Sequence, residues 1–567
     1  MIKTLSRALV ALFVFASLAQ AGEETTARQA YGLAAAAKRR LVLLTDDVGV
    51  DSTGAANSDA GINRLLAGGN VYIAAPCGTF LIASTVKIAS SAFIDGRGEC
   101  TVFKVSSAMS GAASNYRAVL APTFGGAVFE NADWINGNSG ISLAHFQIDA
   151  SALLPQKMHV IAFYKSSGLT VDGLTIKGRD NADSNTYTGV ALINSSSYFV
   201  THNRTSALVT AIGSWDGSKY GWIYANDIAG GSTAKAQNGV VVNAIATNYA
   251  VNTSDNIHVL SNSIHDFPAS VATAIDLTGL CYSGDNLPCA SGAGPFSYGV
   301  LNDSEATGNT ISNFGGQGIR AGEGARLDVL QNKIIGTGNH AITVRSGRAG
   351  PSIGVRVADN TIENANMNSH LNIDAISIGN NSFDAPLNTV VKDNNITGSK
   401  HRYPVSVNSG AVGTIVSGGV WDAGTAGEFN NVGTATQSEY KVSWLPDLRF
   451  GGAAAGMTYA SRSGWYRRTG LKMTYVCGNF TLLSKGTSTG PATINGLPFT
   501  SSSDDQVLPI SKHSNLITPP EPAPFSVVTS STAFIKLFVN GAQSVNITNT
   551  TFNDTSGLSF CGPLALQ

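Results

Sequence analysis

Charged residues are scarce in this sequence. Asp, Glu, Lys and Arg make up 13% of its 567 residues and the formal net charge is −1, whereas about 25% of an average soluble domain is charged. A protein that binds nucleic acid needs a basic face to neutralise phosphates, and attachment to anionic lipid needs clusters of Lys and Arg. We therefore expect no nucleic-acid partner, and no membrane partner for the mature chain.

Long apolar runs are also missing, apart from one at the start of the chain. The basic residues Lys3 and Arg7 precede the apolar stretch 8–16, and the tripeptide Ala-Gln-Ala follows at 19–21. A basic start, a short apolar core and a small-x-small site are the three parts of a secretory signal peptide. We predict that residues 1–21 are removed as a signal. The alternative is a helix that stays in the mature chain as an amphipathic or membrane-anchoring segment.

Cysteine is limited to six residues, and none has the Cys-x-x-Cys spacing of a zinc site. Histidine pairs are not clustered either, so the sequence predicts no metal ligands. The cysteines fall into three local pairs, and joining neighbours is the simplest connectivity in the oxidising compartment that a signal peptide implies. The predicted disulfides are Cys77–Cys100, Cys281–Cys289 and Cys477–Cys561. Six buried free thiols are the alternative.

An internal repeat runs through the middle of the chain. The triplet Asn-x-Ile begins at Asn226, Asn262, Asn309, Asn332, Asn360 and Asn394, and a weaker copy begins at Asn203. The steps range from 23 residues (309 to 332) to 47 residues (262 to 309). The shortest step is about one coil of a three-sided solenoid whose coils stack about 4.8 Å apart, and longer steps are coils with inserted loops. We predict that each Ile fills the core and that each Asn sits in a left-handed turn and bonds the neighbouring coil.

Two further segments carry recognisable motifs. An Asp-rich turn at 46–51 is followed by a short helix candidate at 60–66, by Gly-Gly-Asn-Val-Tyr at 68–72 and by Pro-Cys-Gly-Thr-Phe-Leu-Ile at 76–82. Together with the repeat, this order resembles the pectate-lyase-like right-handed β-helix superfamily, and within it the polysaccharide depolymerases of the phage tailspike type. Gly-Leu-Pro-Phe at 496–499, after a strand that begins Gly-Trp-Tyr-Arg, is similar to the small β-sandwich at the end of tail fibres.

The resemblance implies an all-β fold, a right-handed parallel β-helix followed by a small C-terminal β-sandwich. We expect a linker or helical segment at 22–45, the β-helix at 46–425, a linker at 426–460, and a sandwich at 461–567 that trimerises the chain or binds sugar. The family also implies a homotrimer that degrades a bacterial or plant surface polysaccharide. Its members normally have neither signal peptide nor disulfides, so this sequence departs from it. We predict a secreted, extracellular protein, with a virion tail as the alternative.

Candidate site residues come from aligning the coils. Ile275, Ile319, Ile342 and Ile376 each follow a small residue in similar triplets, which are expected to form the same strand of successive coils. The residue after each Ile then points outward, which gathers polar side chains on one face of a charge-poor protein. The catalytic candidates are Asp276, Asp303, Glu305, Glu323, His340 and Asp374, and the substrate-binding candidates are Arg320, Arg345, Trp215, Trp222 and Tyr282. For any single one of them, an ordinary solvated or packed side chain is the alternative.

Two reactions fit such a stripe. Hydrolysis of a glycosidic bond needs two carboxyl groups, about 5 Å apart in retaining enzymes and roughly 6.5–9.5 Å apart in inverting ones. β-Elimination needs a base such as His340 and a cation such as Arg320 or Arg345 that neutralises a uronate. We favour a glycoside hydrolase without a cofactor. A uronate lyase, for which a Ca²⁺ ion is conceivable, is the first alternative, and a non-catalytic adhesin or receptor-binding tail protein is the second.

Overall fold

The computed structural model divides into two compact units, residues 1–234 and 235–567. It describes residues 39–109, 127–152, 158–180, 187–231, 238–246, 253–281, 300–346, 351–379, 386–434, 436–438, 440–470, 473–497, 499, 506–517, 524–528, 535–539 and 545–565. The predicted signal peptide lies outside these ranges. Within them, no helix is long and apolar enough to cross a membrane.

The first unit begins with an entry module. It consists of β1 (Arg40–Leu43), the 3₁₀ turn η1 (Leu44–Asp46), β2 (Thr53–Asn57), α2 (Asp59–Leu66), β3 (Val71–Ala74), β4 (Gly78–Ile82) and β6 (Ala92–Val105). The helix α2 confirms the helix predicted at 60–66, because its apolar residues Ile62, Leu65 and Leu66 are all buried. Asp59 stands in its first turn, where a negative charge is favoured, and accepts a hydrogen bond from Ser84. The strand β1 shows that the segment predicted as a linker or helix already contributes to the sheet.

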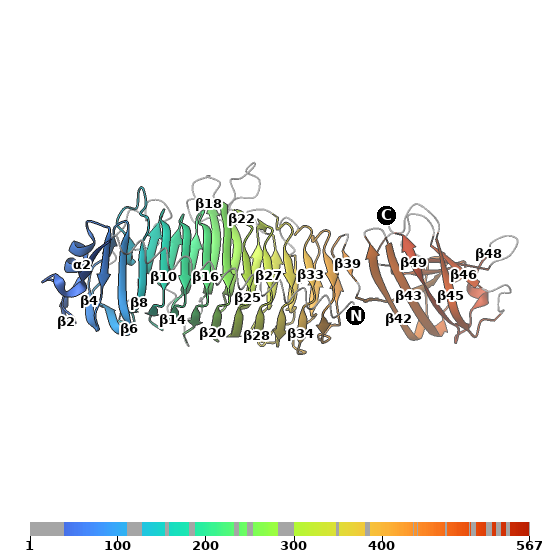
Figure 1. Ribbon diagram of the computed structural model, residues 1–567. Helices are drawn as coiled ribbons and strands as arrows, with labels where there is room; N and C mark the ends of the chain where they lie inside the picture. Colours follow the sequence, from blue (N-terminus) through green and yellow to red (C-terminus); the bar gives the residue numbers. More distant parts are fainter. Residues whose placement is uncertain are drawn as a thin grey trace, which may run out of the picture. The chain divides into compact units, whose positions relative to one another are not determined.

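Each later coil of the first unit places strands on three faces, and neighbouring strands on a face are parallel. These stacked strands are coloured from blue to green in Figure 1. The first face contains β5 (Val86–Ile88), β7 (Ala127–Asn131), β9 (Met158–Tyr164), β12 (Tyr187–Ile193) and β15 (Thr210–Trp215). The second contains β8 (Ser142–Asp149), β10 (Ser167–Asp172), β13 (Ser196–Thr201) and β16 (Lys219–Tyr224), and the third β11 (Thr175–Lys177), β14 (Arg204–Ser206) and β17 (Asp227–Ala229).

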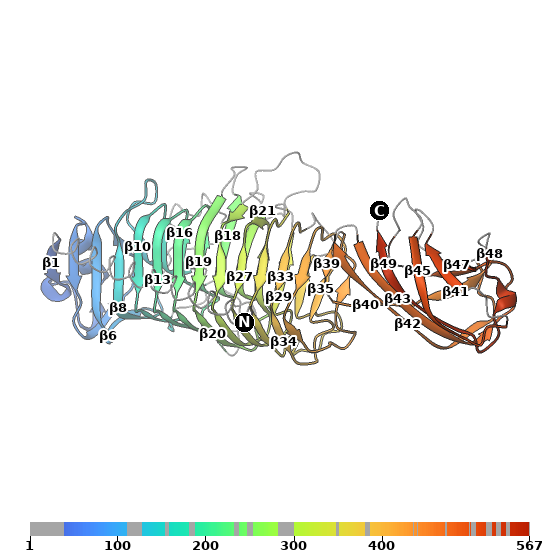
Figure 2. The same cartoon turned by 45° about the vertical axis from the view of Figure 1, so that its right-hand side comes forward.

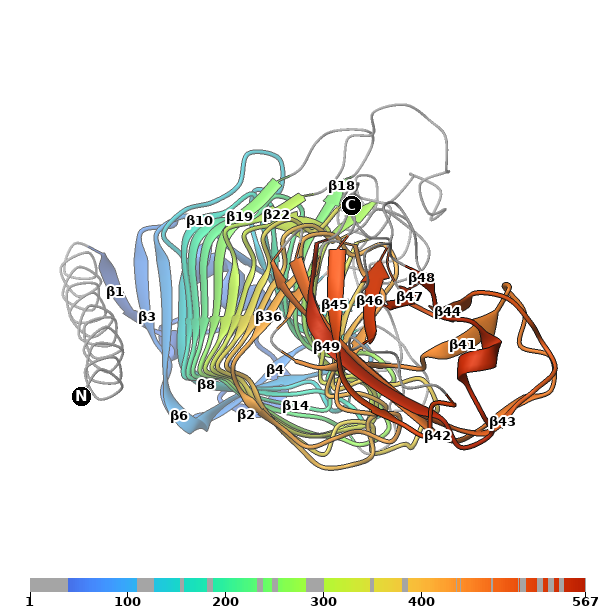
Figure 3. The same cartoon turned by 90° about the vertical axis from the view of Figure 1, so that its right-hand side faces the viewer.

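The second unit repeats this arrangement, and its successive coils overlie one another in Figure 3. Its first face contains β18 (Asn238–Ala246), β21 (Thr273–Cys281), β25 (Gln317–Gly322), β29 (Ile342–Arg345), β32 (Ile376–Ile378), β35 (Val405–Val407) and β38 (Asn430–Asn431). Its second contains β19 (Thr253–Leu260), β22 (Val300–Asn302), β23 (Glu305–Thr307), β26 (Gly324–Ala325), β27 (Asp328–Leu330), β30 (Arg356–Ala358), β33 (Val390–Lys392), β36 (Ile415–Ser417) and β39 (Gln437–Ser438). Its third contains β20 (Ser263–Phe267), β24 (Thr310–Phe314), β28 (Lys333–Thr337), β31 (Thr361–Glu363), β34 (Asn395–Thr397) and β37 (Val420–Trp421).

The turn between the second and third faces holds the predicted asparagine ladder. In the second unit the side-chain amide of Asn309 donates to Oδ1 of Asn332 (3.0 Å), and that of Asn332 donates to Oδ1 of Asn360 (3.0 Å). The first unit has the same bond from Asn203 to Asn226 (2.9 Å). These amides are buried, so each bond satisfies groups that would otherwise be costly to remove from water.

One detail of the ladder prediction is wrong. The asparagines themselves do not occupy the left-handed region; the residue before each of them does, for example Ser261 (φ 53°), Gln331 (φ 54°) and Asp359 (φ 58°). The Asn side chain faces inward to bond two coils, so the chain reversal falls on the exposed residue one position earlier.

The isoleucines of the repeat form a continuous buried row on the third face. Ile264, Ile311, Ile334, Ile362 and Ile396 are partners in register on successive strands, and each is fully buried. Complete burial of such a side chain is worth about 1.5–3 kcal/mol. A slip of one residue would turn the shifted strand's isoleucine to the outside, so this row fixes the register of the coils.

The end of the second unit is an antiparallel β-sandwich (Figure 2). Its strands are β40 (Val442–Trp444), β41 (Asp447–Phe450), β42 (Met457–Gly470), β43 (Met473–Lys485), β44 (Ala492–Asn495), β45 (Gln506–Ser514), β46 (Pro524–Val528), β47 (Ile535–Val539), β48 (Val545–Asn546) and β49 (Gly557–Ala565), with the 3₁₀ turn η2 (Asn549–Thr551). Its core includes Trp444, Leu448 and Phe480. The segment 426–460 is therefore partly strand, and its apolar residues Trp444, Leu448 and Phe450 supply buried positions to β40 and β41.

Two of the predicted disulfides are present. Cys77 and Cys100 are joined in the first unit, and Cys477 and Cys561 link β43 to β49 in the sandwich. The predicted Cys281–Cys289 pair lies outside the described residues.

Candidate functional site

The predicted row of polar residues is present on the first face of the second unit. Asp276, Arg320, Thr343 and Ser377 are partners of one another on β21, β25, β29 and β32. Their neighbours in sequence are the buried isoleucines, so the alternation of a strand turns these four side chains outward. The row is nevertheless sheltered, since the side chains of Asp276 and Arg320 are 6% and 18% exposed.

Asp276 and Arg320 form a bidentate ion pair. Nε of Arg320 donates to Oδ1 of Asp276 (2.6 Å), and Nη2 donates to Oδ2. Thr278 Oγ1 donates to the same Oδ1 (3.1 Å). Both carboxylate oxygens are engaged, so Asp276 positions Arg320 rather than reaching a substrate itself.

Arg345 differs from Arg320 because it forms no ion pair with a carboxylate of the described residues. It ends β29. Burial first and the Arg320 cation second lower the pKa of Arg345, while Asp276 and Glu323 act in the opposite direction. Glu323 is buried in the turn after β25. A partly buried guanidinium that lacks a paired carboxylate is suited to bind an incoming anion.

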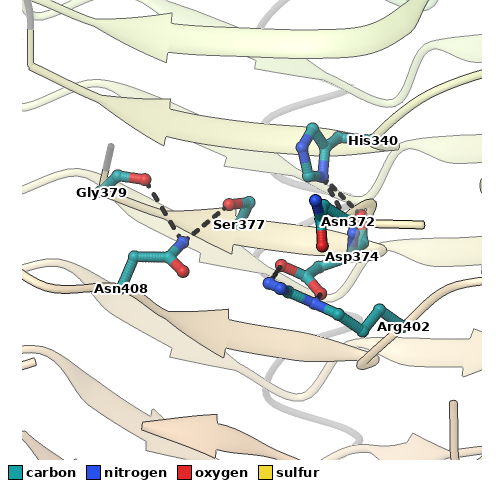
Figure 4. Close-up of a pocket in the computed structure, with 7 residues that line it drawn as sticks. All are labelled: His340, Asn372, Asp374, Ser377, Gly379, Arg402 and Asn408. Carbon is teal, nitrogen blue, oxygen red and sulfur yellow. Dashed lines mark hydrogen bonds and ion pairs between the residues drawn. The ribbon is translucent and has the colours of Figure 1, made fainter. Parts of the chain in front are cut away.

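An open pocket adjoins this row (Figure 4). Its volume is about 390 Å³, within the range of about 300–1,000 Å³ that is usual for ligand sites. It is lined by His340, Asn372, Asp374, Ser377, Gly379, Arg402 and Asn408. Ser377 belongs both to the pocket and to the row, so the two form one polar surface, called here the first-face pocket.

Two fixed contacts shape the wall of this pocket. Arg402 donates from Nε and Nη2 to the two oxygens of Asp374 (2.9 and 2.8 Å), and Asp374 is almost completely buried. Asn408 donates from Nδ2 to Ser377 Oγ (3.0 Å). Asp374 and Asp276 each have both oxygens bound by an arginine, and they stand three coils apart, roughly 14 Å at about 4.8 Å per coil. They cannot be the carboxyl pair of a hydrolase.

His340 is the titratable side chain of the pocket that is placed to accept a proton. Its Nδ1 lies 2.7 Å from the backbone oxygen of Asp374 and 3.1 Å from the backbone nitrogen. In the longer contact the backbone N–H of Asp374 donates to Nδ1. In the tautomer that carries the proton on Nδ1, Nδ1–H donates to the backbone oxygen instead, and the lone pair is then on Nε2. Burial lowers the pKa of His340, with a smaller opposing effect from Asp374, so the imidazole is neutral at neutral pH. A neutral ring with an available Nε2 is a general base.

Asp303 and Glu305 lie on the second face, so the structure does not bring all the predicted catalytic residues together. The reason is that they follow the corner between two faces, whereas the aligned triplets belong to the first face. They line a separate groove of about 490 Å³. Its other lining residues are His258, Ser304, Arg326, Asp328, Gly354, Arg356, Asn388 and Val390. We call it the second-face groove.

A carboxylate pair crosses two adjacent coils in the second-face groove. Glu305 and Asp328 are direct partners on β23 and β27, about 4.8 Å apart along the stack. His258 Nδ1 is 2.6 Å from Glu305 Oε1, and Arg356 donates to both oxygens of Asp328 (3.1 and 2.8 Å). Burial raises the pKa of Glu305, but the hydrogen bonds from His258 and Thr307 outweigh it, and the net pKa is lowered.

Asp303 is likewise bound by a cation. Arg326 donates from Nε and Nη2 to its two oxygens (2.5 and 2.6 Å), and this hydrogen bonding lowers the pKa of Asp303. Glu305 and Asp303 are therefore held ionised, which suits a nucleophile or an electrostatic stabiliser better than a proton donor.

Two of the three predicted aromatic binders, Trp215 and Trp222, belong to the first unit and lie on two different faces. Trp215 ends β15 and packs against a cluster that includes Ala162 and Ala191. Trp222 on β16 stacks on Phe199 with ring centroids 5.1 Å apart and planes at 11°. Tyr282 lies outside the described residues.

Two buried carboxyl groups of the first unit were missed by sequence reasoning. Glu130 on β7 and Asp216 after β15 are each only 4% exposed, and Glu130 Oε2 and Asp216 Oδ1 have no hydrogen-bond partner within the described chain. Burial raises the pKa of each to about 7; for Glu130, Lys87 and Trp134 partly oppose it. The nearby His159 is fully buried, and burial lowers its pKa to about 4.

Other site residues were missed although the sequence contains a signal for them. The residues four positions before the ladder asparagines all line the second-face groove; besides the predicted Glu305 they are His258, Asp328, Arg356 and Val390. Arg402 and Asn408 flank Pro404-Val405-Ser406, the next copy of the aligned triplet. Extending both alignments by one coil identifies these residues.

The described residues contain no group of three or more His, Cys, Asp or Glu side chains placed to hold a metal ion. The donors that face the first-face pocket are instead arginine, amide, hydroxyl and imidazole groups. This donor set favours binding of an anion over binding of a cation.

No family model matches the chain, and no curated protein matches its sequence. Solved structures that resemble it include the Dettilon tailspike protein, at 13% identity and a TM-score of 0.54 over 93% of this chain and 95% of that chain. The chain has the right-handed β-helix fold of that tailspike. Others are PfbA, a surface adhesin of Streptococcus pneumoniae (11% identity, TM-score 0.49, 76% of this chain and 100% of that chain), and the tailspike protein of E. coli bacteriophage HK620 in complex with pentasaccharide (14%, 0.46, 94% and 94%).

Proposed function

We propose that this protein is a polysaccharide-degrading enzyme that binds an acidic polymer in the first-face pocket and cleaves it by β-elimination. The observation that carries the proposal is the place of His340, because the backbone of Asp374 fixes its ring in a pocket lined by polar groups. In the tautomer with the proton on Nδ1, its Nε2 is the base. This differs from the hydrolysis that the sequence favours, because Asp276 and Asp374 stand three coils apart, roughly 14 Å, which is too far for a carboxyl pair.

Each group has a defined part in the proposed reaction. Arg345 lies five residues after His340 along extended chain, about 16 Å away, so it pairs with the carboxylate of a neighbouring uronate of the bound polymer. His340 Nε2 accepts the proton next to the carboxylate of the uronate in the pocket, where Arg402 is the nearby cation. The electron pair of the broken C–H bond forms the C4=C5 double bond, and the bond from C4 to the glycosidic oxygen breaks. The proton that His340 took is then delivered to the leaving oxygen, directly or through a water molecule, which restores the neutral imidazole; no water is consumed.

The proposal is tested on the full chain with polymers that contain or lack uronates. We expect shortening of uronate polymers together with the ultraviolet absorbance of an unsaturated product. His340→Ala should abolish both while polymer binding persists, and Arg345→Ala should raise KM more than it lowers kcat. His370→Ala is the matched control, because this imidazole is exposed and outside the pocket. Cleavage that yields no unsaturated product and survives in His340→Ala would refute the proposal.

Hydrolysis in the second-face groove is a second candidate, favoured by the Glu305–Asp328 pair. Their coil spacing of about 4.8 Å is close to the separation of about 5 Å in retaining glycosidases. Oxygen-18 from water would then appear in the product, and Glu305→Gln and Asp328→Asn would each abolish cleavage. Glu363→Gln on the third-face strand β31 is the control.

The setting of the enzyme is part of the proposal. We propose an extracellular location, by secretion or on a virion tail, and a homotrimer. The mass of the purified protein in solution tests whether it is a homotrimer. The identity of the N-terminal residue of the exported protein tests whether residues 1–21 are removed.

A further inference from the structure

One outer face of the C-terminal sandwich combines aromatic rings with cationic side chains. It is formed by the outward residues of β40, β42, β43 and β49, which the register sets in rows. One row contains Ser443, Trp465, Cys477 and Cys561, and the disulfide Cys477–Cys561 is therefore part of the face. The alternate residues, such as Tyr466, point into the core. We call this surface the outer sandwich face.

Aromatic rings and cations are combined on this face. Trp465 and Tyr475 stack with ring centroids 5.9 Å apart and planes at 20°. Nζ of Lys441 lies 4.3 Å from the centre of the Trp465 ring, and Arg467 is exposed as the direct cross-strand partner of Tyr475. Tyr475 remains 37% exposed, so its ring is available to a ligand.

The described residues of this surface include no acidic side chain. Among the described residues from 440 onward, the acids are Asp447 and Asp554. Neither belongs to the four strands of the face, and Asp447 is bonded to Arg449 and Arg462. The described outer sandwich face therefore carries cations only, in a protein whose net charge is −1.

We propose that the outer sandwich face is a second binding site for the acidic polysaccharide, separate from the cleavage site; the class of ligand rests on the proposed function. A sugar ring offers flat C–H surfaces to Trp465 and Tyr475, while its carboxylates pair with Lys441 and Arg467. A second copy of the chain suits the face less well. Lysine is depleted at the core of protein interfaces, and two such faces would oppose like charges.

The test uses full-length His340→Ala protein, so that polymer is bound without being cut, and measures its affinity for an immobilised uronate polymer. We expect Trp465→Ala and Lys441→Ala each to weaken binding about tenfold. Leu483→Ala is the control, an exposed side chain elsewhere on β43. A carboxyl-reduced polymer should bind weakly to all variants. Because Trp465→Ala could disturb the sandwich, Lys441→Ala and the unfolding midpoint of each variant accompany it.

The outcomes separate this proposal from the proposed function. Unchanged binding in both variants overturns the second site, and so does a change in oligomeric mass without a change in binding, which would make the face a contact between copies. With His340 restored, the control Leu483→Ala should cleave short oligosaccharides at the wild-type rate. If no variant cleaves any polymer but Trp465→Ala still loses binding, the binding site stands and the proposed elimination fails.

Discussion

Replacing the buried carboxyl of Glu130 should change how stability depends on pH. The pKa of Glu130 is raised to about 7 by burial, from 4.5 in the unfolded chain. A raised pKa means that the folded state holds the proton more tightly, so the contribution is complete at low pH and is lost as pH rises through about 7. The difference between the two pKa values corresponds to a total loss of about 3 kcal/mol of unfolding free energy from acidic to alkaline pH. About 2.5 kcal/mol of this loss falls between pH 5 and pH 8.

Glu130→Gln removes this titration while keeping the shape of the side chain. Urea unfolding of wild type and variant across pH 5–8, followed by tryptophan fluorescence, gives the free energy of unfolding of each. We expect the variant to gain about 2.5 kcal/mol relative to wild type between the two ends of that range. The comparison is necessary because Asp216 titrates with the same sign and His159 with the opposite sign, so the slope of the wild-type curve alone does not isolate Glu130.

Glu99→Gln is the matched control, since this carboxylate is exposed and paired only at 3.4 Å with Arg204. Its curve should run parallel to that of wild type, because an exposed ion pair contributes little. Parallel curves for wild type and Glu130→Gln would refute the reasoning, for they would mean that Glu130 titrates as it does in water.

Three further predictions follow from the same contacts. Because burial lowers the pKa of His340, the acid limb of the pH–rate profile should fall below pH 6.5; a limb above that value would exclude His340 as the base. Asn332→Ala should cost about 3 kcal/mol of unfolding free energy, since it removes buried bonds to two coils, whereas Asn395→Ala, an exposed neighbour of the ladder, should cost little. Removing the Cys477–Cys561 disulfide, which closes 84 residues, should destabilise its region by about 4.5 kcal/mol, and removing Cys77–Cys100, which closes 23, by about 3.5 kcal/mol; equal losses would contradict this order.

Much of the fold is written in short-range patterns and could be predicted. The Asn-x-Ile repeat identified the coils because, in every coil, the Asn occupies a buried corner and the Ile lies in the core. Two disulfides and the helix α2 also followed from local spacing. The left-handed backbone conformation was predicted at the asparagines, and this was wrong. The turn needs both a left-handed residue and a buried amide, and two adjacent residues, Gln331 and Asn332, provide them separately.

The site was harder to predict because a site depends on which corner of the coil a residue occupies. The first-face row was found, since Asp276, Arg320 and their partners follow the aligned isoleucines. Alignment on the isoleucines did not show that Asp303 and Glu305 lie around a corner, although the place of Glu305 four residues before Asn309 indicates it. Nothing in the sequence said that Arg402 binds both oxygens of Asp374. The burial of Glu130 depends on side chains brought together from several coils, and no local pattern reports it.

The asparagine ladder has a consequence for how such a protein can change. Its bonds are 2.8–3.0 Å long whether the two asparagines are 23, 28, 34 or 47 residues apart. The spacing of the coils at the ladder is therefore constant. Residues inserted between one ladder asparagine and the next do not alter this spacing. Loops of different length and chemistry can be exchanged there while the coils stay in register, so that recognition of a new polymer requires new loops and no new core.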